Sequence, residues 1–198
     1  FYVTGHPLRK YEVEYKSFAN FHIGEVEENE EIENVRACGV ITDVRTKIDK
    51  SNKQMAFFTI DDFTGSCECL MFSKVYADYG KYVLKEEPVF VIGNLESSGD
   101  QVKMHVNKLL PIDVARNELA GGIRINIVKE KVPPEKLIEL QPILDKYSGK
   151  TPVFIQLFTN GSRSSVYALK NHRVNLSTEL FNQLTELFGE DSFLLNPK

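Results

Sequence analysis

Residues 54–72 read QMAFFTIDDFTGSCECLMF, and this stretch restricts the fold of the chain more than any other. Apolar and polar residues alternate on both sides of a turn at residues 61–65. Period-two alternation is typical of strands with one buried face. The stretch therefore predicts an antiparallel hairpin with strands near 54–61 and 66–72.

The same alternation assigns side chains to the two faces of the hairpin. If Phe58 and Ile60 point into a core, the intervening Phe57 points to the opposite face. On the second strand Cys67 and Cys69 take the inward positions. We therefore expect an exposed aromatic ring on an otherwise polar outer surface.

Two further runs rich in β-branched residues each contain an interior glycine, Gly39 and Gly93. Such glycines are typical of bulges and of the corners of small barrels. Five strands with one helix between the third and the fourth predict an OB-fold, a partly open Greek-key barrel. The other elements predicted for this barrel are strands at 35–47, 88–97 and 101–112 and a helix at 73–82, with Ser73 as its N-cap.

The remainder of the chain predicts a small α+β domain after the barrel. An apolar stripe over 177–188, ended by Gly189, is typical of an amphipathic helix. Pro142 is expected to kink or divide the helix that is predicted over 134–147. The elements predicted here are strands at 123–128, 152–159, 165–170 and 192–195 and helices at 113–121, 134–147 and 177–188.

The composition changes mark four segments. Residues 1–33 read as an N-terminal segment ending in an acidic linker that follows a preceding domain. Residues 34–113 form the predicted barrel, 114–121 a linker helix that stops at a pair of glycines, and 122–198 the α+β domain.

The overall charge limits the classes of function. The 198 residues carry a formal net charge of −4, so binding to nucleic acid would need a local basic patch. No run is long and apolar enough for a membrane span, and no membrane contact is expected. Cys38, Cys67 and Cys69 have no spacing typical of disulfides or zinc, which predicts buried free thiols and a cytoplasmic location.

The candidate binding residues gather around the predicted hairpin. Residues 45–53 have a net charge of +3 in an acidic chain, from four cations and one aspartate. Cations beside an exposed aromatic ring suit the phosphates and bases of single-stranded nucleic acid, although a solvated loop explains the charges equally well. The candidates are Arg45, Lys47, Lys50, Lys53 and Phe57, with Lys103 and His105 as weaker members.

The sequence indicates no catalytic site, no metal site and no cofactor. The pair Asp61-Asp62 is better explained by turn hydrogen bonds than by magnesium. The segment 183–188, QLTELF, is similar to peptides that bind sliding clamps, but its leucines belong to the apolar stripe of a predicted helix. Binding to a sliding clamp through this segment is therefore not expected.

Several stretches together resemble one family. The opening FYVTGHPL, the CGVI at 38–41, and the segment from Phe57 through Gly65 to Phe72 are similar to a region of the alpha subunit of bacterial DNA polymerase III. The resemblance covers nearly the whole chain. In that family the TGHP-type motif precedes the OB domain.

The resemblance implies a parent chain that is a DNA-directed DNA polymerase, a nucleotidyltransferase. This piece lacks the catalytic carboxylates, so it is expected to be non-catalytic and to lie at the carboxy-terminal end. The resemblance further implies weak contact of the OB domain with single-stranded template DNA and docking of 122–198 to the clamp-loader tau subunit. Two alternatives stay open: a barrel that serves only as a structural or protein-interaction module, and a tRNA anticodon-binding domain of an aspartyl-type aminoacyl-tRNA synthetase.

Overall fold

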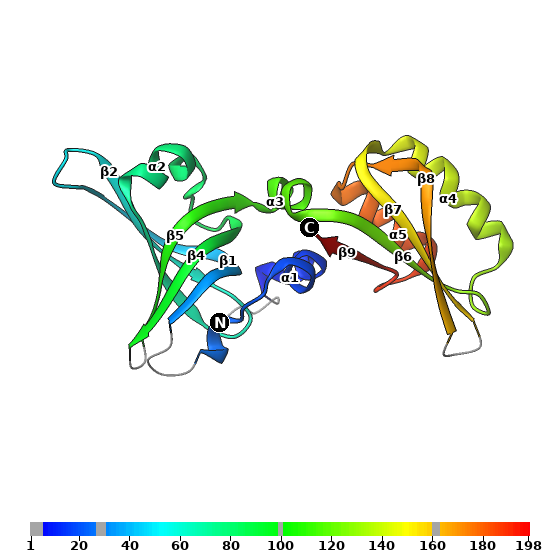
Figure 1. Ribbon diagram of the computed structural model, residues 1–198, viewed down its shortest axis with the longest axis horizontal. Coiled ribbons are helices and arrows are strands. Elements are labelled where there is room, and N and C mark those ends of the chain that lie inside the picture. Colours follow the sequence, from blue (N-terminus) through cyan, green and yellow to red (C-terminus); the bar gives the residue numbers. More distant parts are fainter. Residues whose placement is uncertain (1–5, 27–30, 99–100, 160–162) are drawn as a thin grey trace. The chain divides into compact units, whose positions relative to one another are not determined.

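The computed structural model describes residues 6–26, 31–98, 101–159 and 163–198. The chain divides into two compact units, an N-terminal unit of residues Phe1–Val114 and a C-terminal unit of residues Ala115–Lys198 (Figure 1). The division falls inside helix α3 (Ile112–Leu119), close to the predicted linker helix. Residues 27–30 of the predicted acidic linker lie outside the described residues.

The N-terminal unit contains a closed five-stranded barrel, so the predicted OB-type architecture is confirmed. Around the barrel the strands follow the order β1-β2-β3-β5-β4. Helix α2 (Ser73–Tyr79) and the short helix η3 (Gly80–Tyr82) lie between the third and fourth strands in sequence, as predicted. The strands are β1 (Glu31–Ile48), β2 (Gln54–Asp61), β3 (Ser66–Met71), β4 (Pro88–Ser98) and β5 (Gln101–Pro111).

Strand β1 closes the barrel because it pairs with two different neighbours. Its first half pairs with β4 and its second half with β2, and the change occurs at Val40. Gly39 lies beside this change, where an added Cβ would come within 2.9 Å of the Ile60 Cβ. At Gly93, next to a register shift in β4, an added Cβ would lie 2.1 Å from the His105 carbonyl oxygen. Both glycines therefore permit close approach of neighbouring strands, and the register shift beside Gly93 agrees with the predicted bulge.

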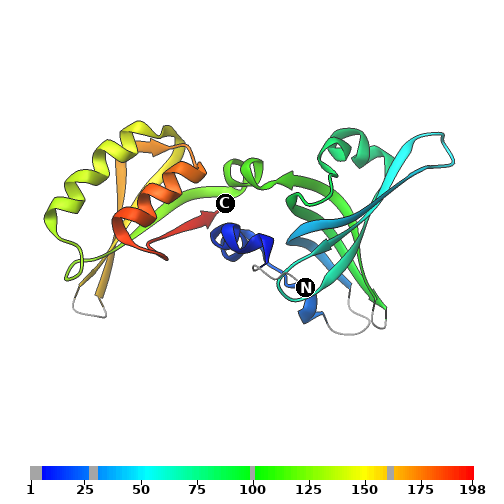
Figure 2. The ribbon, with the colours of Figure 1, turned by 180° about the vertical axis from the view of Figure 1, so that it is seen from behind.

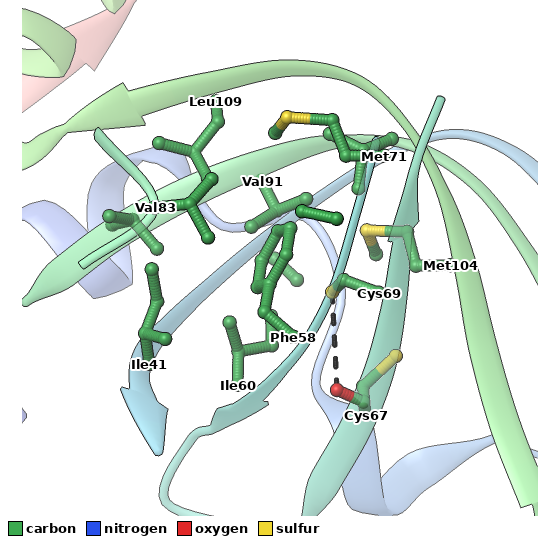
Figure 3. Packing of buried hydrophobic residues seen from close by; sticks show 14 of the residues in the cluster. Ile41, Phe58, Ile60, Cys67, Cys69, Met71, Val83, Val91, Met104 and Leu109 are labelled. Carbon is green, nitrogen blue, oxygen red and sulfur yellow. Dashed lines mark hydrogen bonds between the residues drawn. The ribbon is translucent and has the colours of Figure 1, made fainter. Parts of the chain in front are cut away.

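The barrel interior is filled by the side chains that the alternation assigned to it. Phe58, Ile60, Cys67, Cys69 and Met71 are essentially inaccessible to solvent and pack in one cluster (Figure 3). The thiol of Cys69 lies 3.9 Å from the Cys67 carbonyl oxygen, at the outer limit for a weak S–H hydrogen bond. All three cysteines are free and buried.

This burial predicts slow thiol chemistry. Desolvation raises the pKa values of the Cys38 and Cys69 thiols well above the usual range, which removes the reactive thiolate. In the folded protein we expect a disulfide reagent such as DTNB to react about 100-fold or more slowly than with free cysteine. All three thiols should react promptly in denaturant. Rapid reaction of even one thiol under native conditions would contradict the packing.

The described part of the N-terminal segment packs on the outside of the barrel rather than forming a separate linker. Cys38, Phe90 and Leu110 occupy one cross-strand row on the outer surface of β1, β4 and β5, and all three are buried. Phe18 covers this row with its ring centroid 5.9 Å from that of Phe90. Leu8 is also fully buried. The helices of the segment are η1 (Pro7–Tyr11), α1 (Glu12–Phe18) and η2 (Ile23–Glu25).

Asp62 joins this segment to the turn between β2 and β3. Its carboxylate accepts hydrogen bonds from the Ile23 amide at 3.0 Å and the Tyr15 hydroxyl at 3.2 Å. It also accepts bonds from the Thr64 and Gly65 amides at 2.6 and 2.8 Å. Burial, with the nearby Asp62 charge, raises the pKa of Tyr15, so its hydroxyl stays protonated as a donor.

The C-terminal unit is a four-stranded mixed sheet with two helices on one face (Figures 1 and 2). The strand order is β8-β7-β6-β9, with β6 parallel to β7 and the other pairs antiparallel. Ile123 and Ile125 of β6 pack toward the helices together with Leu180 and Leu184 of α5, and all four are buried. The elements are β6 (Ala120–Val128), α4 (Pro134–Lys146), β7 (Ser148–Thr159), β8 (Arg163–Val174), α5 (Thr178–Phe188) and β9 (Phe193–Pro197).

Two details of the predicted helices are wrong. The helix expected over 113–121 ends at Leu119, and Gly121 and Gly122 lie within β6 because this strand pairs with β9. Ser73 is the first residue of α2 and not its N-cap, since its hydroxyl bonds instead to Asp49. Of the two outcomes expected at Pro142, a kink or a division, the division does not occur, because α4 continues through this residue. Ser177 and Gly189 do cap α5, as the sequence predicted for Gly189.

Candidate nucleic-acid interface

A bulge in β1 gives the barrel its candidate binding face. The register between β1 and β2 shifts between Ile41 and Asp43, so three residues of β1 oppose two of β2. Before the bulge, odd-numbered residues such as Ala37 point into the core, and after it the even-numbered Val44 does. The extra residue therefore turns Arg45 outward.

The outward side chains form one row across the open side of the barrel. Arg45 of β1 pairs in register with Phe57 of β2, and Phe57 pairs with Leu70 of β3. Leu70 in turn pairs with His105 of β5. This row, Arg45–Phe57–Leu70–His105, is called the outer row below. Unlike the row under Phe18, its members are exposed or half-buried.

Phe57 is the centre of the cationic part of the outer row. Its neighbour Phe58 is 1% exposed inside the barrel, whereas Phe57 is half-buried outside it. The Lys47 ammonium lies 5.0 Å from the centroid of the Phe57 ring, within cation–π range. The Arg45 Nε donates a hydrogen bond of 2.9 Å to the exposed Asp43 carboxylate. Exposed ion pairs of this kind contribute little stability, so Arg45 is available to a stronger anion.

The loop between β1 and β2 has a defined structure because Asp49 organises it. The Asp49 carboxylate accepts hydrogen bonds from the backbone amides of Ser51 at 2.8 Å and Lys53 at 2.9 Å. A hydrogen bond from the Ser73 hydroxyl, followed by the one from the Lys53 amide, lowers the pKa of Asp49. The loop is thereby tied to the start of α2.

The structure separates the four cations that the sequence grouped together. Arg45 and Lys47 lie beside Phe57, and Lys50 is exposed in the loop. Lys53 instead lines a hollow beside α2, together with Ser73 and other residues of the barrel end. The shared patch therefore consists of two cations beside one ring.

The β5 end of the outer row holds an aromatic residue that the sequence reasoning missed. The Phe72 ring stacks on His105, with centroids 5.9 Å apart and planes inclined by 26°, and Phe72 is 50% exposed. The alternation of β3 was the available signal, because Glu68 and Leu70 point outward and Phe72 is the next position at the same spacing of two residues.

Acidic groups lie close to the predicted candidates Lys103 and His105. Lys103 pairs in register with Glu68 and Glu96, and His105 Nε2 lies 3.8 Å from the Glu96 carboxylate. His105 also lines a hollow with Glu31, Glu33 and Glu96. A phosphate backbone is therefore favoured at the Phe57 end of the outer row and opposed toward β4.

Asp61 and Asp62 do not form a carboxylate pair for a cation. Both oxygens of Asp62 are occupied by the hydrogen bonds of the turn and of the N-terminal segment. Within the described residues no group of three or more His, Cys, Asp or Glu side chains is arranged to hold a metal ion. No helix in the described parts of the chain has the length and apolar content needed to cross a bilayer.

One family model matches the barrel. The family named for the tRNA anticodon domain, and described as an OB-fold nucleic acid binding domain, matches residues 35–112. The barrel is therefore an OB-fold domain. Among solved structures, a replication protein A domain from Methanococcus maripaludis is 18% identical, with a TM-score of 0.38 over 46% of this chain and 93% of that one.

Nearly the whole chain is similar to a segment of the alpha subunit of DNA polymerase III, which confirms the predicted resemblance. It is 25% identical to the Pseudomonas aeruginosa subunit over 98% of the chain, and 30% identical to that of Buchnera aphidicola over 98%. The Escherichia coli K12 subunit is 24% identical over 96% of the chain. The chain spans 17% of the length of these relatives.

Proposed function

We propose that the chain is the non-catalytic carboxy-terminal part of a DNA polymerase III alpha subunit, a DNA-directed DNA polymerase. Its OB barrel binds single-stranded template DNA weakly, and its C-terminal unit docks another replisome subunit. The similarity over nearly the whole chain supports the polymerase assignment. By analogy with that family, the docked subunit is the clamp-loader tau protein.

The proposed DNA contact depends on one observation, the open Phe57 ring with Arg45 opposite and Lys47 above it. A base stacks on the ring, which contributes about 1–3 kcal/mol and does not depend on base identity. Lys47 then exchanges its cation–π contact for a phosphate, and Arg45 exchanges Asp43 for a second phosphate. The mechanism captures a flexible polyanion and requires no cofactor.

Titration of the protein with fluorescein-labelled oligo-dT tests this contact. We expect weak binding whose logarithm falls linearly with the logarithm of salt concentration between about 50 and 200 mM. The double change Arg45→Glu and Lys47→Glu should weaken binding at least about tenfold. It should also reduce the salt slope by about 1.4, at about 0.7 for each lost phosphate contact on a single strand.

The matched control changes Lys10→Glu and Lys85→Glu, which alters the net charge equally at two exposed positions outside the outer row. This control should retain most of the binding. Equal losses in both double variants would mean that only total charge matters. Binding that is absent at high protein concentration, or that does not respond to salt, would contradict the proposal.

The alternative role as a structural or protein-interaction module has one specific observation in its favour. The hollow that His105 lines also contains Glu31, Glu33 and Glu96, so carboxylates gather at the β5 end of the outer row. In that case the outer-row changes would leave DNA binding by a whole polymerase intact and would weaken the assembly of that polymerase with its partner subunits.

The tRNA anticodon alternative is supported only by the family match to residues 35–112, whereas the polymerase similarity extends over both units.

A further inference from the structure

Strand β8 of the C-terminal unit is an outer strand with an open edge. It lies at one end of the sheet order β8-β7-β6-β9, and β7 is its only partner among the described strands. Residues 164–168 are all exposed, with Val166 54% and Tyr167 55% accessible. Neither proline nor glycine interrupts the strand from 163 to 174. Strand edges of this kind are templates for pairing with another extended segment.

Apolar side chains lie on both faces of this edge. Val166 pairs in register with Gln156, on the face without helices, and Tyr167 pairs with Ile155, on the helix face. Helix α4 packs over β8, where Asp145 lies 3.5 Å from His172.

An added strand would therefore find apolar contacts at Val166 on one face and at Tyr167 on the other. Such a strand would carry apolar side chains on both of its faces to meet them.

The charge distribution specifies the rest of the partner. The four strands of this sheet contain Arg124, Lys150, Arg163, Lys170 and Arg173 and not one aspartate or glutamate. The acids of the unit lie on its helices and turns instead. Like charges oppose pairing of β8 with a second copy of itself, and they attract an acidic strand.

We propose that β8 is a docking edge that receives an extended, acidic and apolar segment of a partner protein as a fifth strand of the sheet. Backbone hydrogen bonds to the open edge provide the affinity. Val166 and Tyr167 select apolar side chains, and Lys170 and Arg173 select carboxylates. The inference rests on the proposed docking role of the C-terminal unit and assigns that role to one surface.

A short fluorescent peptide of repeated Glu-Glu-Val-Val tests the edge in the full chain, because this repeat places valine and glutamate on both faces of a strand. We expect saturable binding, and slower hydrogen exchange of the amides of residues 164–168 when the peptide is present. A peptide of repeated Lys-Lys-Val-Val should bind at least about tenfold more weakly. Val166→Glu and Tyr167→Glu each remove an apolar contact and add a repulsive charge, so each should cause a similar loss, and both exposed sites tolerate glutamate in the folded protein.

Leu84→Glu provides the matched control, because Leu84 is 55% exposed but belongs to the N-terminal unit. Peptide binding that survives the β8 changes, or no peptide binding, would overturn the proposal. So would dimerisation that protects residues 164–168 without peptide, since a second copy would then be the occupant. If the protein captures purified tau equally well before and after Val166→Glu, docking stands and the β8 edge is excluded.

Discussion

Replacement of Asp62 by alanine is expected to lower the free energy of unfolding of the N-terminal unit by about 3–4 kcal/mol. Asp62 is 5% exposed, and its loss would leave the Ile23, Thr64 and Gly65 amides without their acceptor. The N-terminal segment would lose its connection to the β2–β3 turn. Denaturant-dependent hydrogen exchange of amides in β1 and β2 measures the effect in this unit alone.

The neighbouring aspartate supplies the control for this prediction. Asp61 is half-buried, and among the residues that the structure describes its carboxylate accepts one long hydrogen bond, of 3.4 Å, from the Thr42 hydroxyl. Asp61→Ala should therefore cost about 1 kcal/mol or less. Similar losses for both variants would mean that the Asp62 hydrogen bonds do not hold the segment on the barrel.

Alanine substitutions at the adjacent residues Phe57 and Phe58 should have separate effects, one on DNA affinity and the other on stability. Phe57→Ala removes the stacking surface, so the affinity for oligo-dT should fall by about 5- to 150-fold, which corresponds to 1–3 kcal/mol. Its effect on unfolding should be small, because the ring is half-buried on the outer face. Phe58→Ala instead leaves a cavity in the barrel core and should cost about 3–5 kcal/mol of stability.

Two measurements on each variant make this comparison. Chemical denaturation gives the stability, and oligo-dT titration under conditions where each variant is folded gives the affinity. A Phe57→Ala variant with unchanged affinity would contradict stacking at this ring. A Phe58→Ala variant as stable as the parent would contradict the packing of Figure 3.

The barrel could be predicted because the sequence pattern that specifies it, the alternation of apolar and polar residues, extends over short stretches of the chain. Alternation over 54–72 placed Phe58, Cys67 and Cys69 inside and Phe57 outside, and the structure confirms each position. The interior glycines predicted bulges or barrel corners, and the register shift beside Gly93 agrees with that prediction. The amphipathic period of α5 likewise predicted its buried leucines and its end at Gly189.

The N-terminal segment was not predictable in the same way. Helix α1 has only seven residues, too few for a helix to be stable alone. It exists because Phe18 packs on Phe90 and Tyr15 donates to Asp62, two contacts with residues more than 40 positions away in the sequence. The same covering segment buries Cys38 and leaves the outer row as the open side of the barrel.

The sequence by itself determined the strands, the inward and outward sides of the hairpin and the presence of an excess of cations near Phe57. Only the tertiary structure decided which of these cations lie on the same face of the barrel as Phe57. One extra residue at the Ile41–Asp43 bulge reverses the alternation of β1 and turns Arg45 and Lys47 outward, whereas Lys53 lines the hollow beside α2. A period of two specifies faces only while the register is unbroken, and register depends on the partner strand.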